Sequence, residues 1–174
     1  VLYDARHEMK GWNEVDFPDY QWENATILGA YPCKPWNNLI SRPFPNWRDG
    51  GLTKYLAVEN KVDGDSLFVI GKLPKNITVT AYFKIKCKAG ELIDIRSDNY
   101  KGGSEYNVRA EYVTKEGIQY FEMPNYVNGH NIIYRFPKDV KIISVKYRET
   151  AFNTHHIGSF RCNDEFYNKL SELK

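Results

Sequence analysis

Few residues in this sequence have the types and spacing needed for chemistry. His155 and His156 are adjacent, and a pair of imidazoles suggests a metal site. Because neighbouring strand residues point to opposite faces, such a pair rarely reaches one ion, and a polar strand end is the favoured interpretation. Asp16 and Asp19 supply too few oxygens for calcium, so an Asx turn is favoured there. We therefore predict no metal site and no cofactor.

Catalytic motifs are also absent from the sequence. It contains no G-x-S-x-G, no H-E-x-x-H, no phosphate-binding loop and no EF-hand loop. A glycosidase needs two carboxylates that face one bond, and the sequence singles out no such pair. We predict that this chain contributes no catalytic residue.

Aromatic residues are the main candidates for ligand binding, because a flat ring can stack on the apolar face of a pyranose. They make up 15% of the chain, a heavy load for a globular protein. The candidate carbohydrate-binding residues are Trp12, Trp36, Trp47, Arg148 and Glu149. The alternative is structural: each Trp pins a connecting segment to its scaffold, and the two charged residues form ion pairs.

Three parts of the chain would position these residues. Residues 1–50 hold five prolines and all four tryptophans, which predicts an irregular connecting segment that runs over a larger surface. Residues 51–160 alternate short β-branched and aromatic runs with turn-forming residues, a pattern typical of a β-sandwich domain. Residues 161–174 begin a helix, with Asn163 as its expected N-cap and apolar residues at helical spacing, namely Phe166, Leu170 and Leu173.

The clearest predicted strand is 77–87, where apolar residues occupy one parity and Thr78, Thr80, Tyr82, Lys84 and Lys86 the other. Further strands are expected at 91–97, 106–113, 118–122, 130–136 and 140–148. The strands 106–113 and 118–122 should be antiparallel neighbours across a Gly-containing hairpin loop. The predicted fold class is all-β, an antiparallel, jelly-roll-like sandwich with a short C-terminal helix.

Composition excludes several classes of partner. The 24 Lys and Arg against 22 Asp and Glu leave a net charge of +2, so nucleic acid and anionic membranes are not expected partners. Three widely spaced cysteines favour neither a disulfide framework nor a zinc site, although one bridge remains open. No signal sequence or membrane span is visible, and a start without Met suggests a removed signal or an excised piece.

Three stretches resemble the sequences of bacterial α-L-rhamnosidases. Residues 3–12 (YDARHEMKGW) and 16–22 (DFPDYQW) are similar to a run that precedes the β-sandwich of that family. Residues 42–52 (RPFPNWRDGGL) look like a segment common in a Bacteroidetes branch. Residues 146–154 (KYRETAFNT) with 158–170 (GSFRCNDEFYNKL) are similar to the junction into the helical catalytic domain, with Ala151 and Phe152 replacing Gly and Tyr of the pattern.

The resemblance implies a β-sandwich module in front of an (α/α)6 barrel that hydrolyses terminal α-L-rhamnosides with inversion. In the family pattern the catalytic acids lie beyond residue 174, so none falls in this chain. It further implies a catalytic domain as partner and a periplasmic or secreted location. Three interpretations stay open: a module that braces the catalytic domain, a carbohydrate-binding module for rhamnose-containing glycans, and an independent enzyme.

Overall fold

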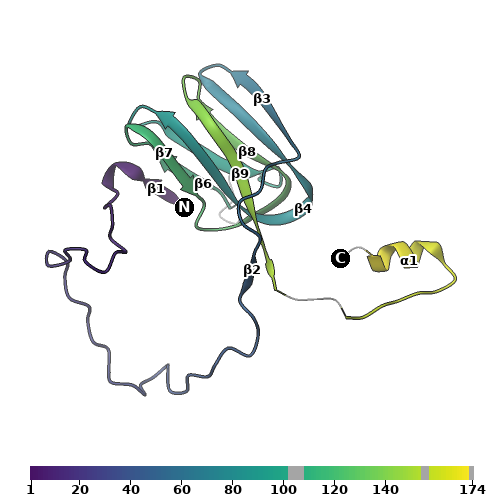
Figure 1. Cartoon of the computed structure of the whole chain (residues 1–174), viewed down its shortest axis with the longest axis horizontal. Helices are drawn as coiled ribbons and strands as arrows, with labels where there is room; N and C mark the ends of the chain where they lie inside the picture. Colours follow the sequence, from purple (N-terminus) through teal and green to yellow (C-terminus); the bar gives the residue numbers. More distant parts are fainter. Residues whose placement is uncertain (102–107, 154–156, 173–174) are drawn as a thin grey trace.

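The computed structural model describes residues 1–101, 108–153 and 157–172 and shows one β domain with two long extensions (Figure 1). Its strands are β1 (Leu2–Asp4), β2 (Trp47–Asp49), β3 (Ala57–Asp63), β4 (Ser66–Cys87), β5 (Leu92–Ser97), β6 (Ala110–Val113), β7 (Gly117–Glu122), β8 (Val127–Pro137) and β9 (Lys141–Phe152). A 3-10 helix, η1 (Ala5–His7), follows β1, and α1 (Glu165–Glu172) lies near the C-terminus.

Strand β4 is the spine of the sheet. Its first half pairs with β3 and β8, and its second half pairs with β9 and β7, in every case antiparallel. The two halves meet where the register with β8 shifts between Lys72 and Ile77. Pro74 lies in this interval, and a residue without an N–H is tolerated where the ladder is interrupted. The shift lets one strand serve two differently directed parts of the sheet.

From β8 the sheet continues through β5 and β6 to β1, and from β9 it continues to β2. The β1–β6 pair is parallel and the other pairs are antiparallel. The prediction of a mostly β fold with one short C-terminal helix is confirmed. The predicted antiparallel jelly-roll-like sandwich is not, because the described strands form one mixed, strongly curled sheet.

The predicted hairpin between 106–113 and 118–122 is wrong. Strand β6 pairs with β5 and β1, whereas β7 pairs with β4. The two strands instead face each other across the core, where the rings of Tyr112 and Phe121 lie 4.9 Å apart. The Gln119 side chain binds the backbone of the loop between β6 and β7: its amide oxygen accepts from Lys115 N (2.9 Å), and its amide nitrogen donates to Lys115 O (2.7 Å). The loop is thus held by side-chain hydrogen bonds, and not by the backbone pairing between strands that a hairpin would have.

The other predicted strands agree with the structure. Residues 77–87 lie within β4, and 130–136 lie within β8. The ranges 91–97 and 118–122 differ from β5 and β7 by one residue at the start. The range 140–148 starts one residue before β9, which continues to Phe152. Residues 106 and 107, the pair His155 and His156, and Leu173 lie outside the described residues. The helix is capped one residue later than predicted: Asp164 Oδ1, not Asn163, accepts from Phe166 N (2.9 Å).

The core fills the inside of the curl. Phe83 is fully buried and contacts the rings of Tyr112, Phe121 and Phe136 at 5.2, 5.8 and 5.7 Å. Deeper along the sheet, the hydroxyls of Tyr55 and Tyr134 share a hydrogen bond of 2.7 Å, and Tyr134 also donates to Tyr82 O (3.1 Å). These bonds satisfy polar groups that burial would otherwise penalise.

Gly71 of β4 makes room for the buried Tyr55. A Cβ at position 71 would lie 2.6 Å from the nearest atoms of the Tyr55 ring. Glycine is therefore required here by close packing against an aromatic face.

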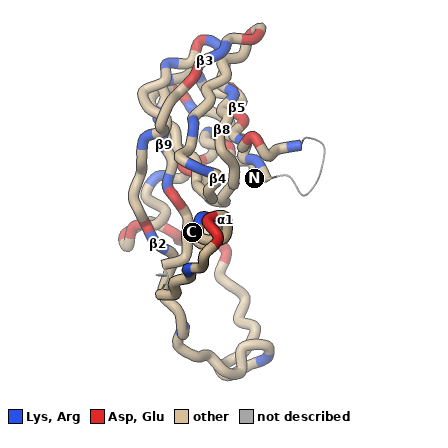
Figure 2. Tube along the Cα trace, turned by 90° about the vertical axis from the view of Figure 1, so that its right-hand side faces the viewer, with Lys and Arg blue, Asp and Glu red and all other residues tan. Residues whose placement is uncertain are grey.

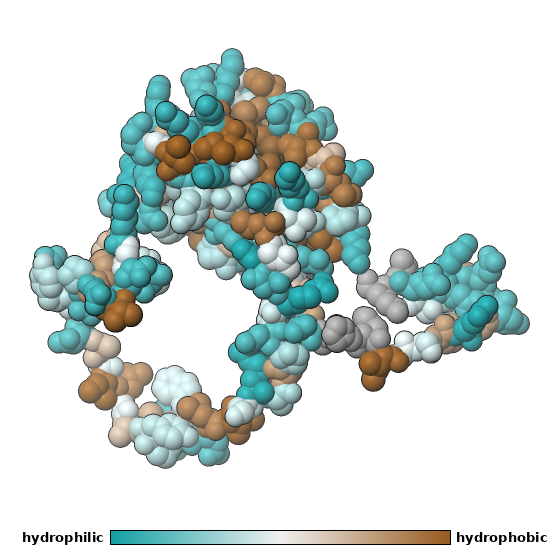
Figure 3. All heavy atoms as spheres, in the orientation of Figure 1, coloured by the Kyte–Doolittle hydropathy of each residue, from teal (hydrophilic) through white to brown (hydrophobic). Residues whose placement is uncertain are grey.

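Two segments extend away from the sheet. Residues 8–46 contain no helix or strand, and between 24 and 41 their only charged residue is Lys34, so the loop is mostly neutral in Figure 2. Apolar side chains lie exposed along it, as Figure 3 shows; they include Ile27, Leu28, Leu39 and Ile40. Helix α1 buries none of its residues. No described helix is long and apolar enough to cross a membrane.

Candidate functional site

The outward surface of β7, β4 and β9 brings charged and aromatic side chains of three strands side by side. Alternation in β4 turns Phe83 and Ile85 into the core, so Tyr82, Lys84 and Lys86 point outward. Register places Glu122 and Tyr120 of β7 beside them on one edge, and Lys146 and Arg148 of β9 on the other. We call this surface, with Thr80, Lys141 and Ser144, the outer face.

An ion-pair network crosses the outer face. Arg148 donates to Glu122 through Nε (2.7 Å) and Nη2 (3.2 Å), and its Nη1 donates to Asp49 at the end of β2. Thr80 donates to the same Glu122 carboxylate at 2.7 Å. Arg148 therefore ties the short strand β2 to the body of the sheet.

The electrostatics of this network keep both carboxylates ionised. Burial alone would raise the pKa of Glu122, but hydrogen bonds from Arg148 and Thr80 outweigh it and lower the pKa below its ordinary value. The Gly51 N–H and then Arg148 lower the pKa of Asp49. The same bonds, first from Glu122, raise the pKa of Arg148. A carboxylate needed as a general acid has its pKa raised instead, so neither of these acids suits that role.

Two tyrosines stack beside this network, and one of them is largely exposed. The rings of Tyr82 and Tyr120 lie 6.5 Å apart at 26°, and Tyr120 is 71% exposed. Burial, followed by the nearby Tyr120 and Glu122, raises the pKa of Tyr82, so its hydroxyl stays protonated. The exposed ring of Tyr120 can accept the apolar face of a sugar or of another planar group, and the partly buried ring of Tyr82 stacks with it.

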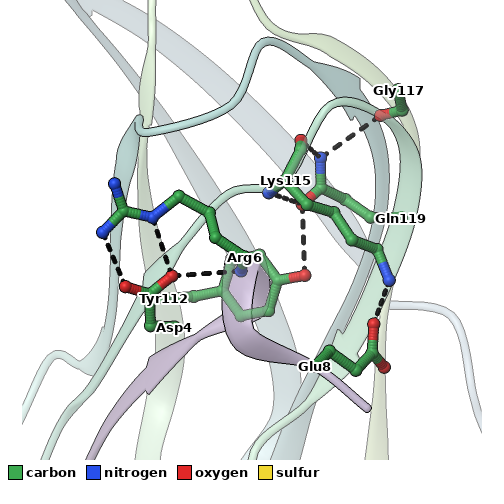
Figure 4. Close-up of polar contacts among 7 residues, drawn as sticks. All are labelled: Asp4, Arg6, Glu8, Tyr112, Lys115, Gly117 and Gln119. Atoms are coloured by element: carbon green, nitrogen blue, oxygen red, sulfur yellow. Dashed lines mark hydrogen bonds and ion pairs between the residues drawn. The ribbon is translucent and has the colours of Figure 1, made fainter. Parts of the chain in front are cut away.

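A groove of about 610 Å3 opens next to these rings, along β7. It is lined by side chains from several elements, including Tyr3, Leu52, Tyr82, Lys84, Tyr120 and Glu122. Tyr3 and Glu8, which also line it, flank η1, where Asp4 accepts from Arg6 N (3.0 Å) and from the Arg6 guanidinium (Figure 4).

The loop between β6 and β7 contacts one of these lining residues, Glu8. Lys115 pairs with Glu8, and Tyr112 donates to Gln119 Oε1 at 3.1 Å, so the loop is held to both η1 and β6 (Figure 4). The groove thus has walls of fixed geometry with aromatic surfaces and a few charged groups, which is the usual make-up of a small-ligand site.

The structure does not bring the predicted site residues together. Trp12 and Trp36 lie on the irregular segment, with no ring contact to Trp47 among the described residues. Trp47 packs on β2 against Tyr126 (5.8 Å) and Phe152 (5.6 Å). All four tryptophans are between 47% and 61% exposed, so none is a fully buried pin within this chain.

Arg148 and Glu149 lie on adjacent positions of β9 and use opposite faces. Arg148 joins the network of the outer face, and Glu149 pairs with Arg48 Nη2 at 3.0 Å. The contacts match the structural alternative considered for these residues, and sugar binding by them stays a prediction. Asp16 and Asp19 are exposed, and no group of three or more potential metal ligands was found among the described residues. Cys33, Cys87 and Cys162 are free thiols.

Sequence reasoning missed Tyr82, Tyr120 and the groove as a possible site. One signal was present: Tyr82 shares the outward parity of its strand with Thr80 and Lys84, and an aromatic ring among polar outward residues is a departure from simple alternation. The position of Tyr120 beside it depends on the β4–β7 register, which no local pattern contains.

This chain is similar to solved structures of bacterial rhamnosidases. No protein-family model matches the chain, and no curated protein matches its sequence. A GH78 family rhamnosidase of Bacillus sp. GL1 is similar over 64% of this chain and 13% of that chain, at 20% identity and a TM-score of 0.47.

The α-L-rhamnosidase from Dictyoglumus thermophilum is similar over 97% of this chain, with a TM-score of 0.70 and 25% identity. The match takes up 20% of that enzyme, so the chain spans about a fifth of its length. The Bacteroidetes branch suggested by residues 42–52 stays a prediction. The chain therefore resembles one domain of a larger α-L-rhamnosidase.

Proposed function

We propose that this chain is a non-catalytic β module of an α-L-rhamnosidase-like glycoside hydrolase, and that it braces the catalytic domain of the same polypeptide. The observation that carries the proposal is the similarity over 97% of this chain to one fifth of a much larger rhamnosidase. The similarity extends beyond the sheet to nearly all of the chain, which supports a role for the extensions in the larger protein.

The extensions have the chemistry of surfaces that another domain covers. Helix α1 exposes Phe166, Tyr167 and Leu170, and none of its residues packs on the sheet. The loop adds exposed Leu28 and Ile40. Apolar surface of this kind marks an interface, because leaving it in water is unfavourable.

The decisive experiment compares the isolated 174-residue chain with a longer polypeptide that carries the same sequence and the proposed catalytic domain. Leu170→Asp should lower the melting temperature of the longer polypeptide and shorten the lifetime of its nitrophenyl α-L-rhamnoside hydrolysis on heating. It should leave the melting temperature of the isolated chain unchanged, because Leu170 is 51% exposed there. Lys169→Ala, at an exposed neighbouring position, is the matched control.

Two results would contradict the brace. One is a longer polypeptide that tolerates Leu170→Asp as well as it tolerates Lys169→Ala. The other is hydrolysis of the nitrophenyl rhamnoside by the isolated chain that survives repurification and disappears with an Asp or Glu substitution, since the proposal leaves the isolated chain without catalysis.

A carbohydrate-binding role toward rhamnose-containing glycans is the second candidate, supported by the exposed rings of Trp12, Trp36 and Trp47. Rhamnose at tenfold its dissociation constant would stabilise a binding module by about 1.4 kcal/mol. For a chain of this size that corresponds to a rise in melting temperature of roughly 3–6 °C. The brace predicts no rise, and a saturable rise that glucose does not produce and that Trp36→Ala removes would favour the second candidate. The periplasmic or secreted location stays a prediction from the sequence resemblance.

A further inference from the structure

We propose that the outer face of β7, β4 and β9 binds a carboxylated glycan, a chain of pyranoses that carries uronate groups. This goes beyond the brace and uses a different surface, since the brace depends on α1 and the irregular loop. Two independent features of the outer face carry the proposal: an excess of unpaired ammonium groups and the tyrosine pair beside the groove.

The ammonium groups come from four lysines. Lys84 and Lys86 follow Tyr82 on the outward parity of β4, and register places Lys141 opposite Lys86 and Lys146 opposite Tyr82. Residues directly opposite in an antiparallel pair point to the same face, so all four lysines lie on the outer face. Among the described residues, none of the four side chains has an ion pair or hydrogen bond.

The acids of the outer face do not neutralise these lysines. Glu122 and Asp49 are both held by Arg148, which leaves a surplus of positive charge along β4 and β9. Like charges directly opposite each other, as at Lys86 and Lys141, destabilise a sheet. A pattern that opposes stability without a local compensation indicates a functional use of the charge.

The rings supply the second half of the recognition. Tyr120 is largely exposed and stacks with Tyr82 next to Lys84, at the mouth of the 610 Å3 groove. A pyranose can lie with its apolar face on the exposed Tyr120 ring while its carboxylate reaches an ammonium group, because Lys carries a compact charge on a flexible stem.

The charge pattern favours a glycan over nucleic acid. Bidentate phosphate recognition uses Arg forks, and the arginine of the outer face, Arg148, is already engaged by two carboxylates. The net charge of +2 over the whole chain is also small for a nucleic-acid-binding domain. Carboxylates carried on a chain of pyranose rings match single lysines that lie beside an exposed tyrosine ring.

The proposal is tested with the 174-residue chain by isothermal titration calorimetry against trigalacturonic acid. The matched ligand is its methyl ester, which keeps the rings and removes the charge. We expect the acid to bind at least about tenfold more tightly than the ester at low ionic strength. The difference should shrink as salt is raised, because exposed charges are screened.

Variants locate the site. Lys84→Gln combined with Lys86→Gln, and separately Tyr120→Ala, should each weaken acid binding by about three- to tenfold while melting temperatures stay unchanged. Lys61→Gln on β3 removes an exposed charge outside the outer face and should have no effect.

Four outcomes would overturn the proposal: no binding of the acid, equal binding of the ester, tighter binding of an oligodeoxythymidine than of the acid, or equal weakening by Lys61→Gln. Because Leu170 is untouched in these experiments, their failure would leave the brace standing, and failure of the brace would leave the binding result intact.

Discussion

Replacement of Phe83 by Ala tests the inward parity of β4 directly. Phe83 is fully buried and touches three aromatic rings, so the change removes a large side chain from a site that cannot collapse easily. Such substitutions cost about 3–5 kcal/mol, and the loss of three ring contacts places this one in the upper part of that range. At roughly 2–4 °C per kcal/mol, the melting temperature should fall by about 8–20 °C.

The assay is urea denaturation followed by fluorescence, with Lys84→Ala as the control on the opposite face of the same strand. The control should change the free energy of unfolding by less than about 0.5 kcal/mol. Phe83→Leu, which keeps most of the volume, should cost about 1–2 kcal/mol and keeps the test readable if the Ala variant does not fold. Equal losses for Phe83→Ala and Lys84→Ala would refute the assignment of the two faces.

Three further predictions follow from other parts of the chain. Gly71→Ala should destabilise the domain by about 1–3 kcal/mol in urea denaturation, because the new Cβ meets the Tyr55 ring, and wild-type stability would mean that the ring can move aside. A hydrogen bond from Arg6 lowers the pKa of Asp4 to about 2. The ionised Asp4 carboxylate should therefore stabilise the fold above about pH 4, and this contribution should be lost as the pH falls toward 2. The melting temperatures of wild type and Asp4→Asn should converge over that range. A difference in melting temperature that stays constant with pH would contradict this. The four tryptophans are about half exposed, so acrylamide should quench most of the fluorescence of the isolated chain, and strong protection would contradict the exposure described above.

Local pattern was enough to find most strands. The alternation of 77–87 gave both the strand and its buried face, because inward apolar and outward polar residues follow the pleat. The same pattern could not show that β4 begins at Ser66, since Pro74 and Asn76 look like a strand end. A register shift accommodates them, and that depends on the partner strand β8.

The pairing of β6 and β7 could not be predicted for a similar reason. A short loop ending in Gly117 suits a hairpin equally well, and Gly117 does adopt a positive φ of 90°. What decides the outcome is the packing of Tyr112 against Phe121 and the hydrogen bonds of the Gln119 side chain, which are tertiary contacts. Propensity alone does not contain this information.

The candidate site also depends on contacts between strands that a local sequence pattern does not contain. Arg148 was recognised as a strand-end residue with a possible ion-pair partner, but its partners Glu122 and Asp49 lie 26 and 99 positions away. The predicted tryptophans were chosen by residue type, whereas the structure selects Tyr82 and Tyr120 by adjacency across two strands. Residue type indicated that aromatic rings could bind a sugar, but the strand register decides which rings lie side by side.

The parallel pairing of β1 with β6 also has a consequence for folding kinetics. Val1 N donates to Arg109 O at 3.0 Å across 108 positions of sequence, and Glu111 N donates to Val1 O at 2.7 Å. At synthesis rates of about 5–20 residues per second, roughly 5–20 s pass between the emergence of these two partners. During that interval β1 has no strand to join, and the high contact order of the finished sheet slows closure further. Refolding of the 174-residue chain should therefore be slow, and β6 offers an open edge for association with other chains until β1 joins it.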